Sequence, residues 1–251
     1  MWGASMKAVG LAMLIGCAAA RAQAPASLPD PEEILHFLEG ARASGEPSQV
    51  ELSLTTVEPR GTVTRRYRVL DDGVANTVVQ FLDPLDRGQR MLATPEDIWF
   101  ITPRIRRAIR IPPAQRLFGE ASYGDLARVR WAQDYDAEFD SPHEESADGE
   151  MRWRLLLKAR RTSATYRTIR VRVTQDTWLP RGAEFYVASG KLLKTAEFPD
   201  ARVEHGRLRI DTWVFRSTDA PHRHTVLRIE SVEPKRFPEA MFTRRYLELH
   251  P

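Results

Sequence analysis

Two histidines, His222 and His224, stand two residues apart, which would place both imidazoles on one side of a strand. Imidazole nitrogens are common zinc ligands, so this pair could form half of a metal site. The pair follows Asp219-Ala220-Pro221, whose residue types are typical of a turn, and no companion ligand suggests itself. We therefore interpret both histidines as exposed polar residues and predict no metal site.

Asp83 and Asp86 flank Pro84 and could be read as a carboxylate pair for acid–base catalysis. Aspartate and proline also set turn geometry, which explains the pair better. The sequence contains no G-x-S-x-G elbow, no H-E-x-x-H helix, no glycine-rich phosphate loop and no paired C-x-x-C. We therefore predict that the protein is not an enzyme, with no catalytic residue and no cofactor.

The densest basic cluster consists of Arg104, Arg106, Arg107 and Arg110. Guanidinium groups at this density could contact anionic headgroups or a partner protein. A solvated, charged face of a sheet is the simpler interpretation, so the cluster alone assigns no function.

The first 22 residues have the features of a secretory signal peptide. Lys7 gives a basic leader, and residues 8–20 then run without a charged side chain. That run is too short to cross a bilayer as a helix, which needs about 20 apolar residues. Ala20-Arg21-Ala22 fits the small-x-small cleavage pattern. We therefore expect export to the periplasm and a mature protein that begins at Gln23.

Cys17 is the single cysteine of the chain and ends the sequence Leu14-Ile15-Gly16-Cys17. This sequence resembles the lipobox of bacterial lipoproteins, in which the cysteine is acylated and becomes the new N-terminus. The alternative is that Cys17 is a small apolar residue of the signal peptide. Lipidation would anchor the protein in the envelope, whereas cleavage after Ala22 would release it, and we favour the released form.

The body of the chain is nearly balanced in charge. Removal of residues 1–22 takes away Lys7 and Arg21, which lowers the formal net charge of +3 by two, to +1. Nucleic-acid binders usually concentrate positive charge on one face, so we predict no nucleic-acid partner. Loss of Cys17 would leave no cysteine for a disulfide or a thiolate metal site.

A short amphipathic helix is expected after a Pro/Ala tether at residues 23–29. Asp30 is suited to the N-cap, Pro31 to the first helical position, and two acids follow in the first turn. The apolar residues on one face of this helix are Ile34, Leu35, Phe37, Leu38 and Ala41.

From Val50 onward the apolar residues alternate with polar ones, as in Val50, Leu52 and Leu54. Short alternating runs joined by Gly, Asp and Pro turns indicate an antiparallel meander. Strands are expected from Val50 to Ile111 and again from Arg152 to Val232. Between them, we expect one or two helical turns over Ala114–Arg128 and an acidic loop over Asp140–Glu150. This order fits a single domain, residues 30–251, with one strongly curved sheet and helices on its inner face.

Several phrases in this order resemble the LolA-like outer-membrane lipoprotein-sorting proteins of Gram-negative bacteria. They are FLDPLDRGQRML, DIWFITPRIRRAIRI and FGEASYGDL, followed by LPRGAEFYVASGKLLKTAEFPD, HTVLRIESVE and FTRRYLE. Family members usually carry a more Ser- and Met-rich segment than Arg116 to Ala121 before the Y-x-D-L phrase. If this segment helps to form a lid, the ligand preference would differ here.

The resemblance implies an unclosed antiparallel β-barrel of about eleven strands, with helices that cap an apolar cavity on the concave face. It also implies a monomeric periplasmic carrier for the acyl chains of lipoproteins or other envelope lipids. The implied partners are an inner-membrane export permease and, transiently, a membrane surface. The residues expected to face the acyl chains are Ile34, Phe37, Leu38, Met91, Trp99, Ile101, Leu117, Phe118, Tyr123 and Leu126.

The alternative function is a lipid-sensing regulatory module similar to RseB-type proteins. Those proteins carry an extra C-terminal domain, whereas this sequence ends soon after the last expected strand. We therefore favour the carrier.

Overall fold

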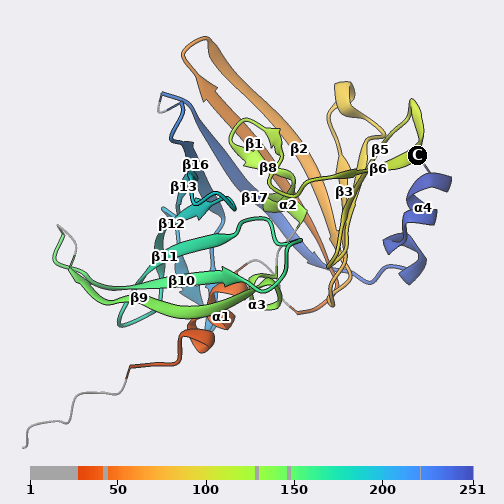
Figure 1. Ribbon diagram of the computed structural model, residues 1–251. Helices are drawn as coiled ribbons and strands as arrows, with labels where there is room; N and C mark the ends of the chain where they lie inside the picture. The colour runs from red at the N-terminus through yellow and green to blue at the C-terminus, as the bar shows by residue number, and fades with distance from the viewer. Residues whose placement is uncertain (1–27, 42–44, 128–129, 146–147, 221, 251) are drawn as a thin grey trace, which may run out of the picture.

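The computed structural model describes residues 28–41, 45–127, 130–145, 148–220 and 222–250. The expected signal peptide, its Cys17 and most of the tether lie outside the described residues. Most of the described residues lie in β-strands (Figure 1). The strands of the main sheet are β1 (Ser48–Glu58), β2 (Gly61–Asp71), β3 (Thr77–Phe81), β4 (Arg90–Ala93), β5 (Ile98–Thr102), β6 (Ile105–Ile111), β9 (Tyr135–Glu145), β10 (Met151–Ala159), β11 (Thr168–Thr174), β12 (Pro180–Tyr186), β13 (Leu192–Glu197), β16 (Thr212–Ser217) and β17 (His224–Pro234).

Two small hairpins and several short helices complete the chain. The hairpins pair β7 (Arg116–Phe118) with β8 (Ala121–Ser122) and β14 (Arg202–Glu204) with β15 (Arg207–Arg209). The α-helices are α1 (Pro31–Glu39), α2 (Tyr123–Ala127), α3 (Trp131–Asp134) and α4 (Arg244–Leu249). Two 3-10 turns are η1 (Pro84–Asp86) and η2 (Glu239–Phe242).

The main sheet has 13 strands in the order β6-β5-β4-β3-β2-β1-β17-β16-β13-β12-β11-β10-β9. Each neighbouring pair is antiparallel, and β1 lies beside β17, so the two ends of the domain meet at the centre of the sheet. The edge strands β6 and β9 do not pair with each other, and the sheet is not closed into a barrel. The predicted mainly β fold with an unclosed antiparallel sheet is confirmed, with two more strands than expected.

The sheet curves around one of its faces. In Figure 1 the long strands β1 and β2 run at a steep angle to β9 and β10. Bulges add to the normal twist of the strands, as where the β1–β17 register shifts between Glu51 and Leu52. The main hydrophobic core fills the concave face and joins both halves of the sheet to α1, α2 and α3. We call it the inner core.

A second, smaller hydrophobic cluster, which we call the outer cluster, lies on the convex face, where η2 and α4 pack on β3 to β6. It contains Leu92, Ile101, Phe242 and Leu247, with Trp99 packed against them. Strand β5 is apolar on both faces because it is covered on both sides: Ile98 enters the inner core and Ile101 the outer cluster.

Helix α1 begins where its sequence predicts and ends at Glu39, with Gly40 as its C-cap. The Asp30 carboxylate accepts a hydrogen bond from the Glu32 backbone N–H at 2.9 Å, and Pro31 is the first helical residue. Two acidic side chains tie the helix to its neighbours, because Glu32 accepts from the Ala137 N–H at 2.7 Å and Glu39 from the Ala132 N–H at 2.6 Å. The apolar face of α1 is thereby held on the concave side of the sheet.

Two expectations for the middle of the chain are correct only in part. One or two helical turns were expected over Ala114–Arg128, and α2 is one such turn, but the residues before it form the β7–β8 hairpin. Gly119 adopts a φ of +55° in the hairpin turn, which lets the chain reverse there. The expected acidic loop from Asp140 belongs to β9 as far as Glu145, where the Asp140 carboxylate lies 3.1 Å from Arg170 Nε.

Candidate functional site

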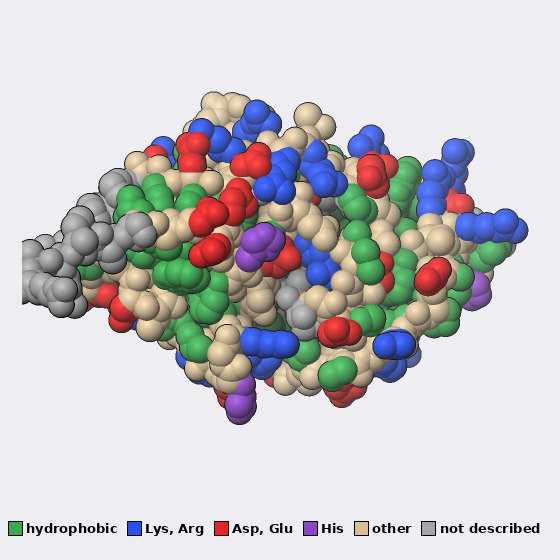
Figure 2. All heavy atoms as spheres, turned by 90° about the horizontal axis from the view of Figure 1, so that it is seen from below, with side chains coloured by type: hydrophobic (Ala, Val, Ile, Leu, Met, Phe, Trp, Pro, Cys, Tyr) green, Lys and Arg blue, Asp and Glu red, His purple; other side chains and the backbone are tan. Residues whose placement is uncertain are grey.

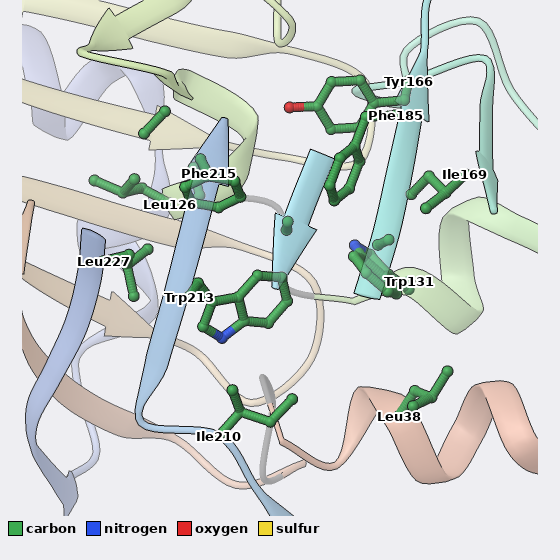
Figure 3. Close-up of a cluster of buried hydrophobic side chains, with 14 of the residues drawn as sticks. Leu38, Leu126, Trp131, Tyr166, Ile169, Phe185, Ile210, Trp213, Phe215 and Leu227 are labelled. Atoms are coloured by element: carbon green, nitrogen blue, oxygen red, sulfur yellow. The ribbon is translucent and has the colours of Figure 1, made fainter. Parts of the chain in front are cut away.

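A cavity of about 110 Å³ lies on the concave side of the central strands. Its floor comes from β1, β2, β16 and β17, and its walls from the end of α1, from α2 and from β15. In Figure 3, Trp213 lies between Leu227 and Trp131, and Leu126 of α2 lies on the side of Leu227. The lining residues are Gly40, Ala41, Ser48, Val50, Leu52, Val69, Asp125, Leu126, Arg209, Trp213, Leu227, Ile229 and Val232.

Most of these lining side chains are apolar, and the charged ones are engaged with other groups. The Asp125 carboxylate is bound within a buried network, and Arg209 Nη2 donates to Asp211 Oδ1 at 3.3 Å. A cavity of this kind offers an apolar guest a surface to bury and few groups with which to react. For scale, an apolar cavity of about 150 Å³ holds one benzene molecule. A long acyl chain would therefore need the cavity to widen.

The cavity is covered on one side by α2. We call residues 116–127, which form the β7–β8 hairpin and α2, the flap. The flap reaches the floor of the sheet at Gly119. A Cβ at this position would lie 2.0 Å from Thr56 Oγ1 and 2.1 Å from Thr225 Oγ1. The Glu120 N–H donates to Thr225 Oγ1 at 2.8 Å. Glycine is required here by both the close approach and the positive φ.

A buried ion pair holds the other end of the flap. The Asp125 carboxylate of α2 pairs with the ammonium of Lys194 from β13, and each side chain is at most 3% exposed. Lys194 Nζ also donates to the Glu120 carbonyl at 2.9 Å and lies 4.2 Å from the centre of the Phe215 ring. Removing one partner of a buried ion pair costs about 3–5 kcal/mol, because the other charge is left uncompensated.

Tyr166 and Ser122 complete this network. Tyr166 Oη donates to Asp125 Oδ1 at 2.8 Å and lies 3.0 Å from Ser122 Oγ, while the Ser122 N–H donates to Asp125 Oδ2 at 2.7 Å. Burial alone would raise the pKa of Asp125, but the Lys194 charge and these hydrogen bonds lower that pKa below its ordinary value. Burial and the Asp125 charge raise the pKa of Tyr166 well above its ordinary value. The network therefore holds a charged pair and a neutral phenol.

A third contact anchors the flap near its turn. Glu120 is 5% exposed and forms an ion pair with Arg223, which also contacts Glu58 at 3.3 Å. Arg116 Nη2 lies 3.4 Å from Glu120 Oε2. The flap is thus fixed to the sheet by charged and polar contacts at both of its ends, while Leu126 presents an apolar side chain to the cavity.

The residues that the sequence predicted for the site lie in three places. Leu126 lines the cavity. Ile34, Leu38 and Met91 belong to the inner core, and Phe37, Leu117, Phe118 and Tyr123 are packed against it. Trp99 and Ile101 were expected to face the cavity, and this placement is wrong. Both point to the outer cluster, because alternate side chains of β5 point to opposite faces of the sheet.

Sequence reasoning missed the residues of β1, β16 and β17 that form the floor, and it missed Lys194. The signal for Lys194 is the run Leu192-Leu193-Lys194-Thr195-Ala196, in which the lysine shares a face with buried Ala196. A lysine at an inward position of a strand needs a carboxylate partner, and the flap supplies it.

Among the residues that the structure describes, no group of three or more His, Cys, Asp or Glu side chains could hold a metal ion. In the same part of the chain, no helix has the length and hydrophobicity to span a membrane. His224 begins β17 and His222 lies in the preceding turn.

The chain is similar to known proteins in both sequence and fold. A family model described as that of an uncharacterized protein matches residues 73–249. The crystal structure of a LolA superfamily protein from Nitrosomonas europaea aligns with a TM-score of 0.79 and 29% identity, over 87% of this chain and 99% of that one. The chain belongs to the LolA-like family. The resemblance inferred from the sequence phrases is confirmed.

Two further structures share the LolA-like fold. One is a putative outer membrane lipoprotein-sorting protein domain from Vibrio parahaemolyticus, with a TM-score of 0.68 and 20% identity over 87% of this chain and 98% of that one. The other is a DUF1329 family protein from Desulfovibrio piger, with a TM-score of 0.67 and 18% identity over 87% and 100%. No curated protein matches the sequence.

Proposed function

We propose that this LolA-like protein is a non-enzymatic periplasmic carrier that binds acyl chains of lipoproteins or other envelope lipids. The observation that carries the proposal is the apolar cavity enclosed by the concave sheet, the end of α1 and the flap. Burial of one methylene group is worth about 0.8 kcal/mol, so six buried methylenes would contribute roughly 5 kcal/mol. The fold it shares with the Vibrio lipoprotein-sorting domain supports the same class of function.

Loading requires the cavity to widen, and the two walls differ in how they are held. The flap is anchored by the Asp125–Lys194 pair and by Glu120. Another wall is formed by Gly40, which has no side chain, and Ala41, which has only a methyl group, and Val232 near the end of β17 is 39% exposed. We infer that an acyl chain enters between the end of α1 and the end of β17, while the flap stays docked.

The export signal at residues 1–22 would bring the carrier to the periplasm, where an inner-membrane export permease is the proposed partner. Whether Cys17 is acylated decides between an anchored and a shuttling carrier. A Cys17→Ala variant with unchanged processing and a soluble product supports the shuttling form. Loss of processing, with retention in the membrane, supports the anchored form.

Native mass spectrometry of the protein purified from its own cells tests the carrier proposal. We expect a population with added mass that fragments to a lipid or an acylated peptide. A second sample with Val50→Trp, which fills the cavity, should lose that added mass, whereas Val63→Trp on the exposed part of β2 should keep it. Added mass that persists equally in both variants would place the lipid elsewhere and contradict the cavity assignment.

A further inference from the structure

The cavity on the concave face has two unlike ends. Its floor follows the paired strands β1 and β17, from Leu227 to the level at which Val50 lies opposite Val232. The inner end is apolar and lies beside α2, because Leu126 lies on the side of Leu227 in Figure 3. The outer end lies where β1 begins and β17 ends, and two polar side chains line the cavity there.

The first of these polar groups is the hydroxyl of Ser48, the residue at which β1 begins. Ser48 lines the cavity together with Val50 and Leu52, which share its face of the strand. The residue is 6% exposed, and its hydroxyl has no hydrogen-bond partner among the described residues. A hydroxyl can both donate and accept a hydrogen bond, so it offers a polar contact to a guest in the cavity.

The second polar group is the guanidinium of Arg209, which comes from β15, where this strand lies against α1. Its hydrogen bond within the described part of the chain runs from Nη2 to Asp211 Oδ1 at 3.3 Å. Nε is buried and makes no hydrogen bond, and Glu204 Oε2 lies 3.7 Å away from it. A guanidinium has five N–H donors, so most of those of Arg209 remain available. The side chain is 41% exposed, which places it at the edge of the cavity.

Net charge does not distinguish this end of the molecule. Residues 200–211 contain three arginines and three carboxylates. Arg202 Nη2 lies 2.8 Å from Asp211 Oδ2 and 3.7 Å from Glu204 Oε2, so both carboxylates are shared between two arginines. The end that carries α1 also shows acidic and basic side chains close together (Figure 2). Recognition of a ligand here therefore depends on directed hydrogen bonds rather than on long-range attraction.

We propose that Arg209 and Ser48 bind the anionic head of the acyl ligand, a carboxylate or a phosphate, while its tail lies along the floor toward Leu227. Hydrogen bonds from a guanidinium to such oxygens are charge-assisted and about twice as strong as neutral ones. The head would stay at the outer end, where the chain enters between α1 and β17. This cargo assignment rests on the proposed carrier function, and it selects anionic amphiphiles over neutral lipids.

Calorimetric titration of the full chain with three ligands that share a ten-carbon chain tests this assignment. The ligands are decanoate, decyl phosphate and 1-decanol. Arg209→Gln should weaken binding of both anions on the order of tenfold and leave the affinity for decanol unchanged. The matched control is Arg207→Gln, an exposed position of the same strand outside the cavity lining, which should keep all three affinities. Unchanged affinity of Arg209→Gln for the anions, or an equal loss for decanol, overturns the proposal.

Ser48→Ala gives a second and independent measurement. It removes the free hydroxyl without adding bulk, and it should weaken binding of the anions about fivefold. No loss for the anions in this variant removes Ser48 from the proposed site. The two anions distinguish the sources of the head, because tighter binding of decanoate indicates a free fatty acid and tighter binding of decyl phosphate a phosphorylated lipid.

The same titrations separate the cargo assignment from the carrier proposal. If the wild type binds decanol as tightly as both anions, and Val50→Trp weakens all three, the anionic cargo is overturned and the carrier stands. If the wild type binds none of the three ligands, or if Val50→Trp binds them as tightly as the wild type, both proposals fail.

Discussion

The ammonium of Lys194 lies 4.2 Å from the centre of the Phe215 ring and forms an ion pair with Asp125. This places a charge from β13 within a buried aromatic region and joins it to the flap. The flap is therefore held by a pair whose members are almost 70 residues apart in sequence, and several predictions depend on that pair.

Lys194→Met should destabilise the fold by about 3–5 kcal/mol, because it leaves the Asp125 carboxylate buried without its cation. The matched control is Lys191→Met, since Lys191 lies just before β13 and forms an exposed pair with Asp219 at 3.1 Å. This control should cost less than about 1 kcal/mol. Urea unfolding of the two variants measures the difference, and equal stability would show that the buried pair does not hold the flap.

The pH dependence of stability should report the same pair. The pKa of Asp125 is lowered in the folded state, so the unfolded chain binds a proton more readily at this residue. The stability that Asp125 contributes is therefore complete above its ordinary pKa of 3.8 and is lost as the pH falls through the lowered value. The Asp125→Asn variant should show a flatter stability profile below this pH. Parallel profiles for the two proteins would contradict the lowered pKa.

Gly119→Ala should destabilise the protein by about 2–4 kcal/mol, from backbone strain at positive φ and from overlap with Thr56 and Thr225. Gly149→Ala is a useful control, because Gly149 also has a positive φ, +77°, but a Cβ there would meet nothing within 4 Å. It should cost only the strain, about 1 kcal/mol. Thermal unfolding compares them, and equal costs would mean that the flap does not approach the sheet at Gly119.

A substitution in the outer cluster should lower the stability of the protein without changing its affinity for a ligand. Phe242→Ala removes a buried ring from the convex face and should cost about 3–5 kcal/mol in stability. Because Phe242 lies on the opposite face from the cavity, the folded variant should bind an acyl probe with unchanged affinity. If the fully folded Phe242→Ala variant lost much of its affinity for the probe, packing on the convex face would influence ligand binding on the concave face.

Local sequence chemistry predicted much of the fold. The Asp30-Pro31 start of α1 and the alternation in Val50, Leu52 and Leu54 each depend on neighbours within a few residues, and both were correct. The segment before α2 was misassigned because the choice between helical turns and a hairpin depends on contacts of Gly119 with β1 and β17. The ordered phrases of the LolA-like family supplied the architecture that local patterns left open.

The site was less predictable than the fold. Trp99 and Ile101 lie in a strand that is apolar on both faces, so alternation could not tell which face turns inward. The cavity floor joins Val50 to Ile229, residues that come together only through the β1–β17 pairing at the centre of the sheet. The role of Lys194 in the buried ion pair could not be predicted from the sequence, because it depends on the position of Asp125 in the folded protein. These features depend on contacts between distant parts of the chain.

Binding of a fluorescent acyl probe to the folded protein tests the central proposal most directly. The titration compares the wild type with Val50→Trp, which fills the cavity, and with Val63→Trp, which adds the same side chain to an exposed position of β2. We predict at least a tenfold loss of probe affinity for Val50→Trp and wild-type affinity for Val63→Trp. Equal affinity in all three folded proteins would contradict the proposal that the cavity holds the acyl chain.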